Sequence, residues 1–358
     1  MNKQPNKDII RLARESRGFT QKDLAEAIPT PQGNISKWEN GMLGLSEDTL
    51  KRISQILKYP EHFFYFDDQI YGPGISGLGI FFHRKRQSVS NKTLDEIHAQ
   101  INVRAIHLRR LLKSIRLKNN LFRFYDLEDF KDKPEDVAKA IRHQWGLPRG
   151  PVANLTKSIE NAGGIVIEFD FGTRAIDAIS QWMPDLPPLF FVNKSSPGDR
   201  LRFSLAHELL HVLCHNHKTY DPTKEDEADK FAAEFLMPKA EISSSLYALN
   251  LAKLAALKEN WKTAMAAILH RATDLEKIKK SYAQYLWMQM GKSGYRLHEP
   301  IEIPREEPSL LSRIIETYCK NYNYSIEELS NLLGLFEQET KDLYFPQKNR
   351  PAYLSVVK

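Results

Sequence analysis

Residues 203–213 of the chain read Phe-Ser-Leu-Ala-His-Glu-Leu-Leu-His-Val-Leu, which places His207-Glu208-x-x-His211 inside a largely apolar run. An α-helix makes one turn in 3.6 residues, so His207 and His211 fall on the same face, one turn apart. Two imidazoles placed in this way can bind one Zn²⁺. Glu208 stands where its carboxylate can take a proton from a water on that metal. The stretch therefore predicts a helix that binds zinc and carries a general base.

A catalytic zinc site needs a third protein ligand, and the residues after the motif offer several. His215 lies a further turn along, where a straight helix carries it away from the metal. His217 has the spacing of the pattern His-Glu-x-x-His-x-x-Gly-x-x-His, but Cys214 replaces the glycine that permits the sharp turn. The acidic stretch Glu225-Asp226-Glu227 begins a segment with Phe and Ala at helical spacing, and taken alone it reads better as a solvated first turn. The residues by themselves leave the third ligand open.

Several further segments, taken together with the motif, resemble the ImmA/IrrE family of metallopeptidases over residues 130–300. Before the motif they are Asp177-Ala178-Ile179-Ser180, Pro188-Leu189-Phe190-Phe191-Val192-Asn193, Arg200 and Arg202-Phe203-Ser204-Leu205-Ala206. After the motif they are Glu227-Ala228-Asp229-Lys230-Phe231-Ala232, Leu236-Met237-Pro238, Leu257-Lys258, Trp261 and His270-Arg271-Ala272.

This resemblance implies a zincin-like α+β domain with a His/His/Glu zinc site. The ligands would be His207, His211 and Glu227, with Glu225 and Asp226 as alternatives to Glu227 in the same acidic cluster. Glu208 would act as general base and later as general acid, and water would hold the open fourth position. Members of the family cleave helix-turn-helix repressors, so the implied substrate is such a repressor or this chain's own N-terminal half.

The first 57 residues carry a second signal. Apolar residues at helical spacing, the capping box Thr20 with Asp23, the N-cap Ser46 and Gly41 after a third helical segment predict four short helices joined by tight turns. Such an arrangement is typical of a helix-turn-helix domain. The stretch resembles the Xre/Cro family of DNA-binding domains, whose third helix enters the major groove. Pro29-Thr30-Pro31 makes the turn before that helix more rigid than is usual in the family.

The resemblance implies a DNA-reading surface on the third helix. Its residues would be Gln32, Asn34, Ser36 and Lys37, with Gln21 touching the DNA backbone from the second helix. Gln and Asn suit paired contacts with adenine, whereas Ser and Lys suit phosphate or guanine. The alternative is a helical scaffold that keeps the shape of such a domain without binding DNA.

The whole chain is expected to adopt a multidomain, mainly α-helical fold with an α+β core. Its predicted parts are a helix-turn-helix domain at 1–68, a Gly-rich linker and basic helical connector at 69–130, a metallopeptidase domain at 131–300 and a small helical region at 301–358. Strand patterns at 163–169, 178–182 and 189–192 predict a small sheet. The segment from Arg84 to Arg123 contains eleven Lys and Arg residues and two acidic residues. Either a solvated basic helix face or additional contacts with DNA phosphates would explain this excess of positive charge.

The C-terminal region contains a further capping box, formed by Ser325 and Glu328. The segment around it echoes the start of the second N-terminal helix but lacks a third helix of the DNA-reading type. Dimerisation and covering of the peptidase cleft are its expected uses.

The composition of the chain narrows the classes of protein to which it could belong. Two cysteines, no apolar leader after Met1 and no apolar stretch of membrane-spanning length favour a cytoplasmic protein without disulfides or a membrane partner. We expect a DNA-binding transcriptional regulator with a zinc-dependent endopeptidase, whose partners are operator-like DNA, a repressor-type protein and a candidate second copy of the chain. The alternative is a non-catalytic repressor or antitoxin-like regulator whose zinc fold serves as a sensor or docking module.

Overall fold

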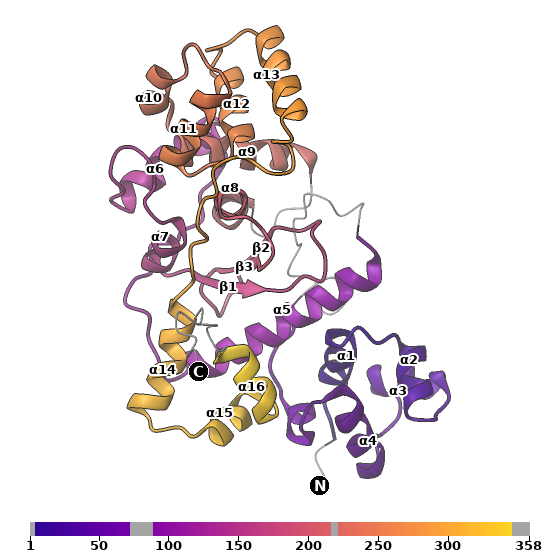
Figure 1. Cartoon of the computed structure of the whole chain (residues 1–358). Helices are drawn as coiled ribbons and strands as arrows, with labels where there is room; N and C mark the ends of the chain where they lie inside the picture. Colours follow the sequence, from indigo (N-terminus) through magenta and orange to yellow (C-terminus); the bar gives the residue numbers. More distant parts are fainter. Residues whose placement is uncertain (1–3, 72–88, 216–220, 346–358) are drawn as a thin grey trace, which may run out of the picture. The chain divides into compact units, whose positions relative to one another are not determined.

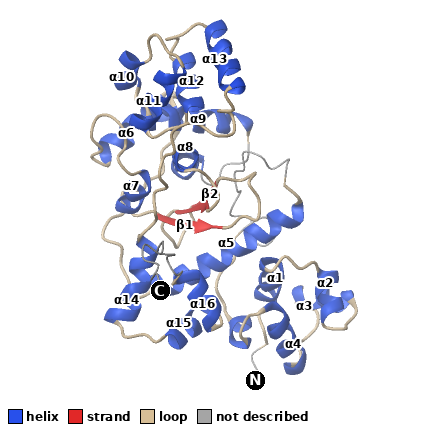
Figure 2. Ribbon diagram, viewed as in Figure 1, coloured by secondary structure: helices blue, strands red, loops and turns tan. Residues whose placement is uncertain are grey.

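The computed structural model describes residues 4–71, 89–215 and 221–345 (Figure 1). It is mainly α-helical, as Figure 2 shows, and contains one three-stranded sheet, which confirms the predicted fold class. The chain divides into two compact units, one with the described residues of 1–70, 90–116 and 312–358, the other with those of 71–89 and 117–311. The predicted Gly-rich linker at 72–79 and His217 lie outside the described residues. The division into four parts stays a prediction.

The first unit is built from short helices with side-chain caps at their starts. Thr20 and Asp23 form the predicted capping box, and Ser46 accepts a hydrogen bond from the Thr49 N–H as the predicted N-cap. The capping box of Ser325 and Glu328 is also present. The helices of this unit are α1 (Lys7–Ser16), α2 (Gln21–Ala27), α3 (Gln32–Glu39), α4 (Glu47–Leu57), α5 (Asn91–Leu112), α14 (Leu310–Asn321), α15 (Ile326–Leu333) and α16 (Glu337–Tyr344). The first two residues of α14 belong to the other unit, because the boundary falls at Ser312.

The helices α15 and α16 pack inside this first unit. Glu339 accepts two hydrogen bonds of 2.8 and 2.7 Å from Arg17, and Tyr344 Oη lies 2.6 Å from Nδ1 of His107 on α5. Gly334 has a φ of +70°, and a Cβ there would lie 2.7 Å from aromatic side-chain atoms, so the contact requires glycine. The C-terminal region is therefore a structural part of the unit that contains the four N-terminal helices.

Two basic residues of the predicted connector are used for packing. Arg110 pairs with Asp68 at 2.7 Å and lies over the ring of Phe66, 3.3 Å from its centroid. Arg109 donates to the carbonyl of Gln69 at 2.9 Å. For these two arginines a structural use is favoured over contact with phosphates.

The second unit contains the sheet. Its strands are β1 (Ile165–Phe169), β2 (Ala178–Gln181) and β3 (Leu189–Asn193), which confirms the three strand predictions. The order is β1-β3-β2, with β3 parallel to β1 and antiparallel to β2, so β2 lies at one edge. The helices are α6 (Pro134–Gln144), α7 (Leu155–Ala162), α8 (Gly198–Leu210), α9 (Pro222–Leu236), α10 (Lys239–Ile242), α11 (Leu251–Trp261), α12 (Met265–Asp274) and α13 (Lys280–Lys292). None of the described helices of the chain is both long and apolar enough to span a membrane.

An extended segment after α13, residues 298–309, holds the start of α8 in place, and we call it the strap. A Cβ on Gly198, the first residue of α8, would lie 2.3 Å from the carbonyl oxygen of Ile303, so only glycine allows this approach. Arg202, buried on α8, pairs with Glu306 of the strap. The strap therefore fixes the helix that carries the histidine motif.

Candidate metal centre and DNA-reading surface

The two histidines of the motif lie side by side at the buried end of α8. Nε2 of His207 and Nε2 of His211 are 3.0 Å apart, and both side chains are almost fully buried. Two donors at about 2.1 Å from one tetrahedral zinc ion would lie about 3.4 Å apart. The two ring nitrogens are thus close to the separation that a shared metal ion requires.

Glu225 on α9 completes this group. Its carboxylate oxygens lie 3.4 Å from Nε2 of His207 and 3.6 Å from Nε2 of His211. Both oxygens are buried, and neither has a hydrogen-bond partner among the residues that the structure describes. A buried carboxylate without hydrogen bonds is costly, and a cation would remove that cost. One donor atom each from His207, His211 and Glu225 lie within 4.8 Å of one another, so this set fits a metal ion.

The structure puts Glu227, the third ligand that the resemblance implied, in another place. Its Oε2 lies 2.8 Å from Nε2 of His215, whereas Glu225, the alternative, faces the histidine pair. The reason is the angular position of each residue around the axis of α9. Residues 225 and 229 are one turn apart and share a face, while residue 227 is rotated by about 200° from residue 225. The other alternative, Asp226, lies in the wall of the cleft beside the site.

A carboxylate on α9 orients His207. Asp229 Oδ1 lies 2.8 Å from Nδ1 of His207, which leaves Nε2 of this ring directed at Glu225. Such carboxylate contacts fix the tautomer of metal-binding histidines. Burial alone would lower the pKa of His207, but its contacts with Asp229 and Glu225 outweigh burial and raise the pKa to about 9. His211 shows the opposite shift, because burial and then the charge of His207 hold its pKa well below the usual value.

Glu208 is buried next to the histidines and is held by the edge strand β2. Its Oε2 accepts hydrogen bonds from the backbone N–H of Ser180 at 2.9 Å and from the Ser180 hydroxyl at 2.6 Å. Burial raises the pKa of Glu208 to about 7, against the opposing effects of His207 and Ser180. A carboxyl group with a pKa near neutrality can both take up and release a proton.

Ser180 was not recognised as a functional candidate from the sequence, where it appears only as part of the resembling segment 177–180. Its N–H is free to bond Glu208 because β2 has a neighbouring strand on one side only. A small hydroxyl residue at the edge of a predicted sheet, just upstream of the motif helix, was the available signal.

A cleft of about 1690 Å³ adjoins this group. His207, Glu208 and Asp229 line it together with residues of β2, α12 and the strap. His270, part of the resembling segment 270–272, also lines the cleft, with its ring 4.9 Å from that of Trp287.

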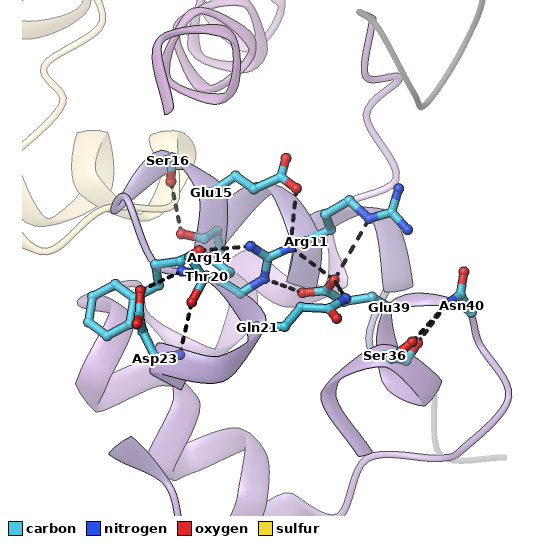
Figure 3. A network of polar contacts seen from close by, with 12 residues as sticks. Arg11, Arg14, Glu15, Ser16, Thr20, Gln21, Asp23, Ser36, Glu39 and Asn40 are labelled. Carbon is cyan, nitrogen blue, oxygen red and sulfur yellow. Dashed lines mark hydrogen bonds and ion pairs between the residues drawn. The ribbon is translucent and has the colours of Figure 1, made fainter. Parts of the chain in front are cut away.

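In the first unit, a buried ion pair joins α1 to the last residue of α3, the helix predicted to read DNA (Figure 3). Arg14 donates to Glu39 at 2.5 and 3.0 Å, and Gln21 donates to the same carboxylate at 2.8 Å. A glutamine amide has two N–H groups, so Gln21 keeps one donor beyond this bond. The network ties the first residue of α2 to the last residue of α3.

The predicted reading residues lie along α3 at different depths. Gln32 and Lys37 are exposed, while Asn34 and Ser36 are half-buried. Asn34 donates to the Thr30 hydroxyl at 3.1 Å, and the Ser36 carbonyl accepts from Asn40 at 2.8 Å. All four side chains therefore belong to the face of α3 that is not packed in the core.

Two family models match the chain. Residues 159–273 match the peptidase family M78 model, described as an IrrE N-terminal-like domain, and residues 10–64 match a helix-turn-helix model. No curated protein matches the chain. The first match supports a metallopeptidase-type domain around the paired histidines, and the second supports a domain of DNA-binding regulation. The chain thus joins an Xre-type helix-turn-helix domain to an ImmA/IrrE-type metallopeptidase domain in one polypeptide.

Proposed function

We propose that this protein is a DNA-binding regulator that cleaves a protein substrate with the help of a zinc ion held by His207, His211 and Glu225. The observation that carries the proposal is the buried Glu225 carboxylate, which faces two ring nitrogens at 3.4 and 3.6 Å and has no hydrogen-bond partner in the described part of the chain. Zinc suits this donor set because His₂Glu is a known catalytic ligand combination that leaves one position open.

Zinc at such a site polarises a peptide carbonyl and makes a water molecule a stronger nucleophile at neutral pH. Glu208 takes the proton of the attacking water and then gives it to the leaving amine. Its pKa of about 7 suits both roles near neutral pH. Ser180 holds one carboxylate oxygen of Glu208 through two hydrogen bonds and so keeps the general base in one orientation.

The size of the cleft supports a polypeptide substrate. Its volume of about 1690 Å³ exceeds the 300–1,000 Å³ typical of small-molecule pockets. We propose a repressor of the helix-turn-helix class as the substrate, on the strength of the family resemblance, with this protein's own N-terminal unit as the second candidate.

For DNA we propose contacts through α3. Gln32 and Asn34 would read base edges, Lys37 and Ser36 would contact phosphate or guanine, and Gln21 would reach the backbone with its remaining amide N–H. The exposed position of Gln32 and Lys37 supports this assignment.

The test compares the full-length protein with its Glu208→Gln variant. Zinc content is measured by metal analysis, and both forms are incubated with helix-turn-helix repressors and alone. Cleavage by the wild type and not by the variant, at equal zinc content, is expected. Equal cleavage by both would contradict the role of Glu208. Zinc without any cleavage would support the alternative, a regulator that uses the zinc fold as a sensor.

A second comparison tests the ligand assignment. Glu225→Ala is expected to lose zinc, whereas Glu227→Ala is expected to retain it with weaker affinity. Loss of zinc from Glu227→Ala alone would restore Glu227 as the third ligand.

A further inference from the structure

His215 is a buried histidine that the ligand set leaves unused. It ends a π-helical turn, His211–His215, that continues α8 directly. A π-helical turn is wider than an α-helical turn, and such turns are frequent at functional sites. Here the turn keeps His215 next to His211, with Nδ1 of the two rings 2.9 Å apart. On its other side, Nε2 of His215 lies 2.8 Å from Glu227.

With both rings neutral, the three groups form a chain with one consistent arrangement of protons. Between two Nδ1 atoms at hydrogen-bond distance, one must carry hydrogen and the other must accept. If His211 carries hydrogen on Nδ1, its Nε2 is unprotonated and directs a lone pair toward His207 and Glu225. His215 then accepts at Nδ1, carries its own hydrogen on Nε2 and donates it to Glu227.

The opposite arrangement of protons is disfavoured by Glu227. With hydrogen on Nδ1 of His215, its unprotonated Nε2 would face a carboxylate oxygen at 2.8 Å, and two acceptors would oppose each other. His211 would then carry hydrogen on Nε2, the atom needed for the metal. The charge of Glu227 therefore selects the tautomer of His211 through His215.

We infer that His215 and Glu227 are positioning residues that hold His211 with its Nε2 lone pair directed at the metal, an inference that rests on the proposed zinc site. The two ligands are then supported alike, since Asp229 contacts Nδ1 of His207 directly at 2.8 Å and Glu227 supports His211 through one intervening ring. Because Glu227 is rotated about α9 away from Glu225, a second histidine is needed to span the distance.

The test measures zinc affinity of the full-length protein by competition with a chelator, which does not depend on cleavage. His215→Leu has similar bulk but no hydrogen bonds, and it is expected to weaken zinc binding by about 10- to 100-fold, as removal of such partners usually does. His215→Gln offers an amide oxygen to His211 and an amide N–H to Glu227, and it is expected to bind zinc within a few-fold of wild type. Glu227→Ala is expected to resemble His215→Leu.

The spectrum of the cobalt-substituted protein gives a second readout, which should change in His215→Leu and stay close to wild type in His215→Gln. Circular dichroism and thermal unfolding of the metal-free variants check that they fold. Wild-type zinc affinity in His215→Leu, or equal loss in the Leu and Gln variants, would overturn the inference. A wild-type protein that binds no zinc would overturn both this inference and the proposed function, whereas zinc binding without cleavage would leave the inference standing.

Discussion

Zinc binding is predicted to release a proton from His207. In the metal-free protein, contacts with Asp229 and Glu225 raise the pKa of His207 to about 9 against the effect of burial. At pH 8, one unit below this value, about nine-tenths of the protein would carry a protonated His207, compared with about 3% for an ordinary histidine of pKa 6.5. Only the neutral ring binds a metal, so the proton must leave on binding.

The number of protons follows from the neighbouring groups. His211 contributes none, because its pKa is held well below the ordinary value and its ring is neutral at pH 8. Glu208 has a pKa of about 7 and is about nine-tenths ionised at this pH, so it contributes about a tenth of a proton at most. The protein side of the site is thus expected to release about one proton per zinc ion.

Titration calorimetry in two buffers with different ionisation enthalpies measures this number. The control is Asp229→Asn, which removes the larger of the two carboxylate contacts that raise the pKa of His207. Any proton lost from a water ligand is common to both proteins, so the difference isolates His207. We expect the variant to release fewer protons, by up to about 0.9. Equal release by the two proteins would refute the proton assignment at this site.

Two further predictions concern the strap and the DNA-reading helix. Glu306→Ala leaves Arg202 buried without its ion-pair partner and should lower the free energy of unfolding of the second unit by about 3–5 kcal/mol. The control Glu302→Ala, at an exposed position of the same strap, should change it by less than about 0.5 kcal/mol. Chemical denaturation measures both values, and equal effects would argue against the ion pair. Lys37→Ala should weaken DNA binding and reduce the slope of log affinity against log salt concentration by about one. The control Lys320→Ala, on α14, should leave the affinity and the slope unchanged. The same loss in both variants would contradict the placement of α3 on DNA.

Local signals in the sequence were sufficient to predict much of the secondary structure. The capping residues Thr20, Asp23 and Ser46 specify helix starts through contacts within three residues, so the predictions needed no tertiary information. The same holds for the pairing of His207 and His211, which depends only on helical periodicity. The three strands followed from short β-branched and aromatic runs.

The choice among the acidic residues of α9 could not be made in this way. Glu225, Glu227 and Asp229 have the same chemistry, and their roles differ only through the rotation of α9 relative to α8. That rotation is set by packing of residues such as Phe231 and Phe235, which the sequence identifies as buried without giving their depth or direction. Likewise the strap contacts the start of α8 from about a hundred residues away, a separation at which local patterns carry no information.

The surroundings of Glu208 favour an enzyme over a purely structural zinc domain. A structural metal site needs ligands only, and burying a further carboxylate beside it costs free energy. Here Glu208 is 6% exposed and lines the cleft, and among the described residues the hydrogen-bond donors to its carboxylate are both on Ser180, at the edge of the sheet. A group kept buried, oriented and close to neutral pKa at the wall of a cleft fits the proposed role of Glu208 in proton transfer. If Glu208 instead served the fold, Glu208→Gln would lower the free energy of unfolding of the zinc-loaded protein. We expect it to leave stability unchanged or higher and to abolish cleavage.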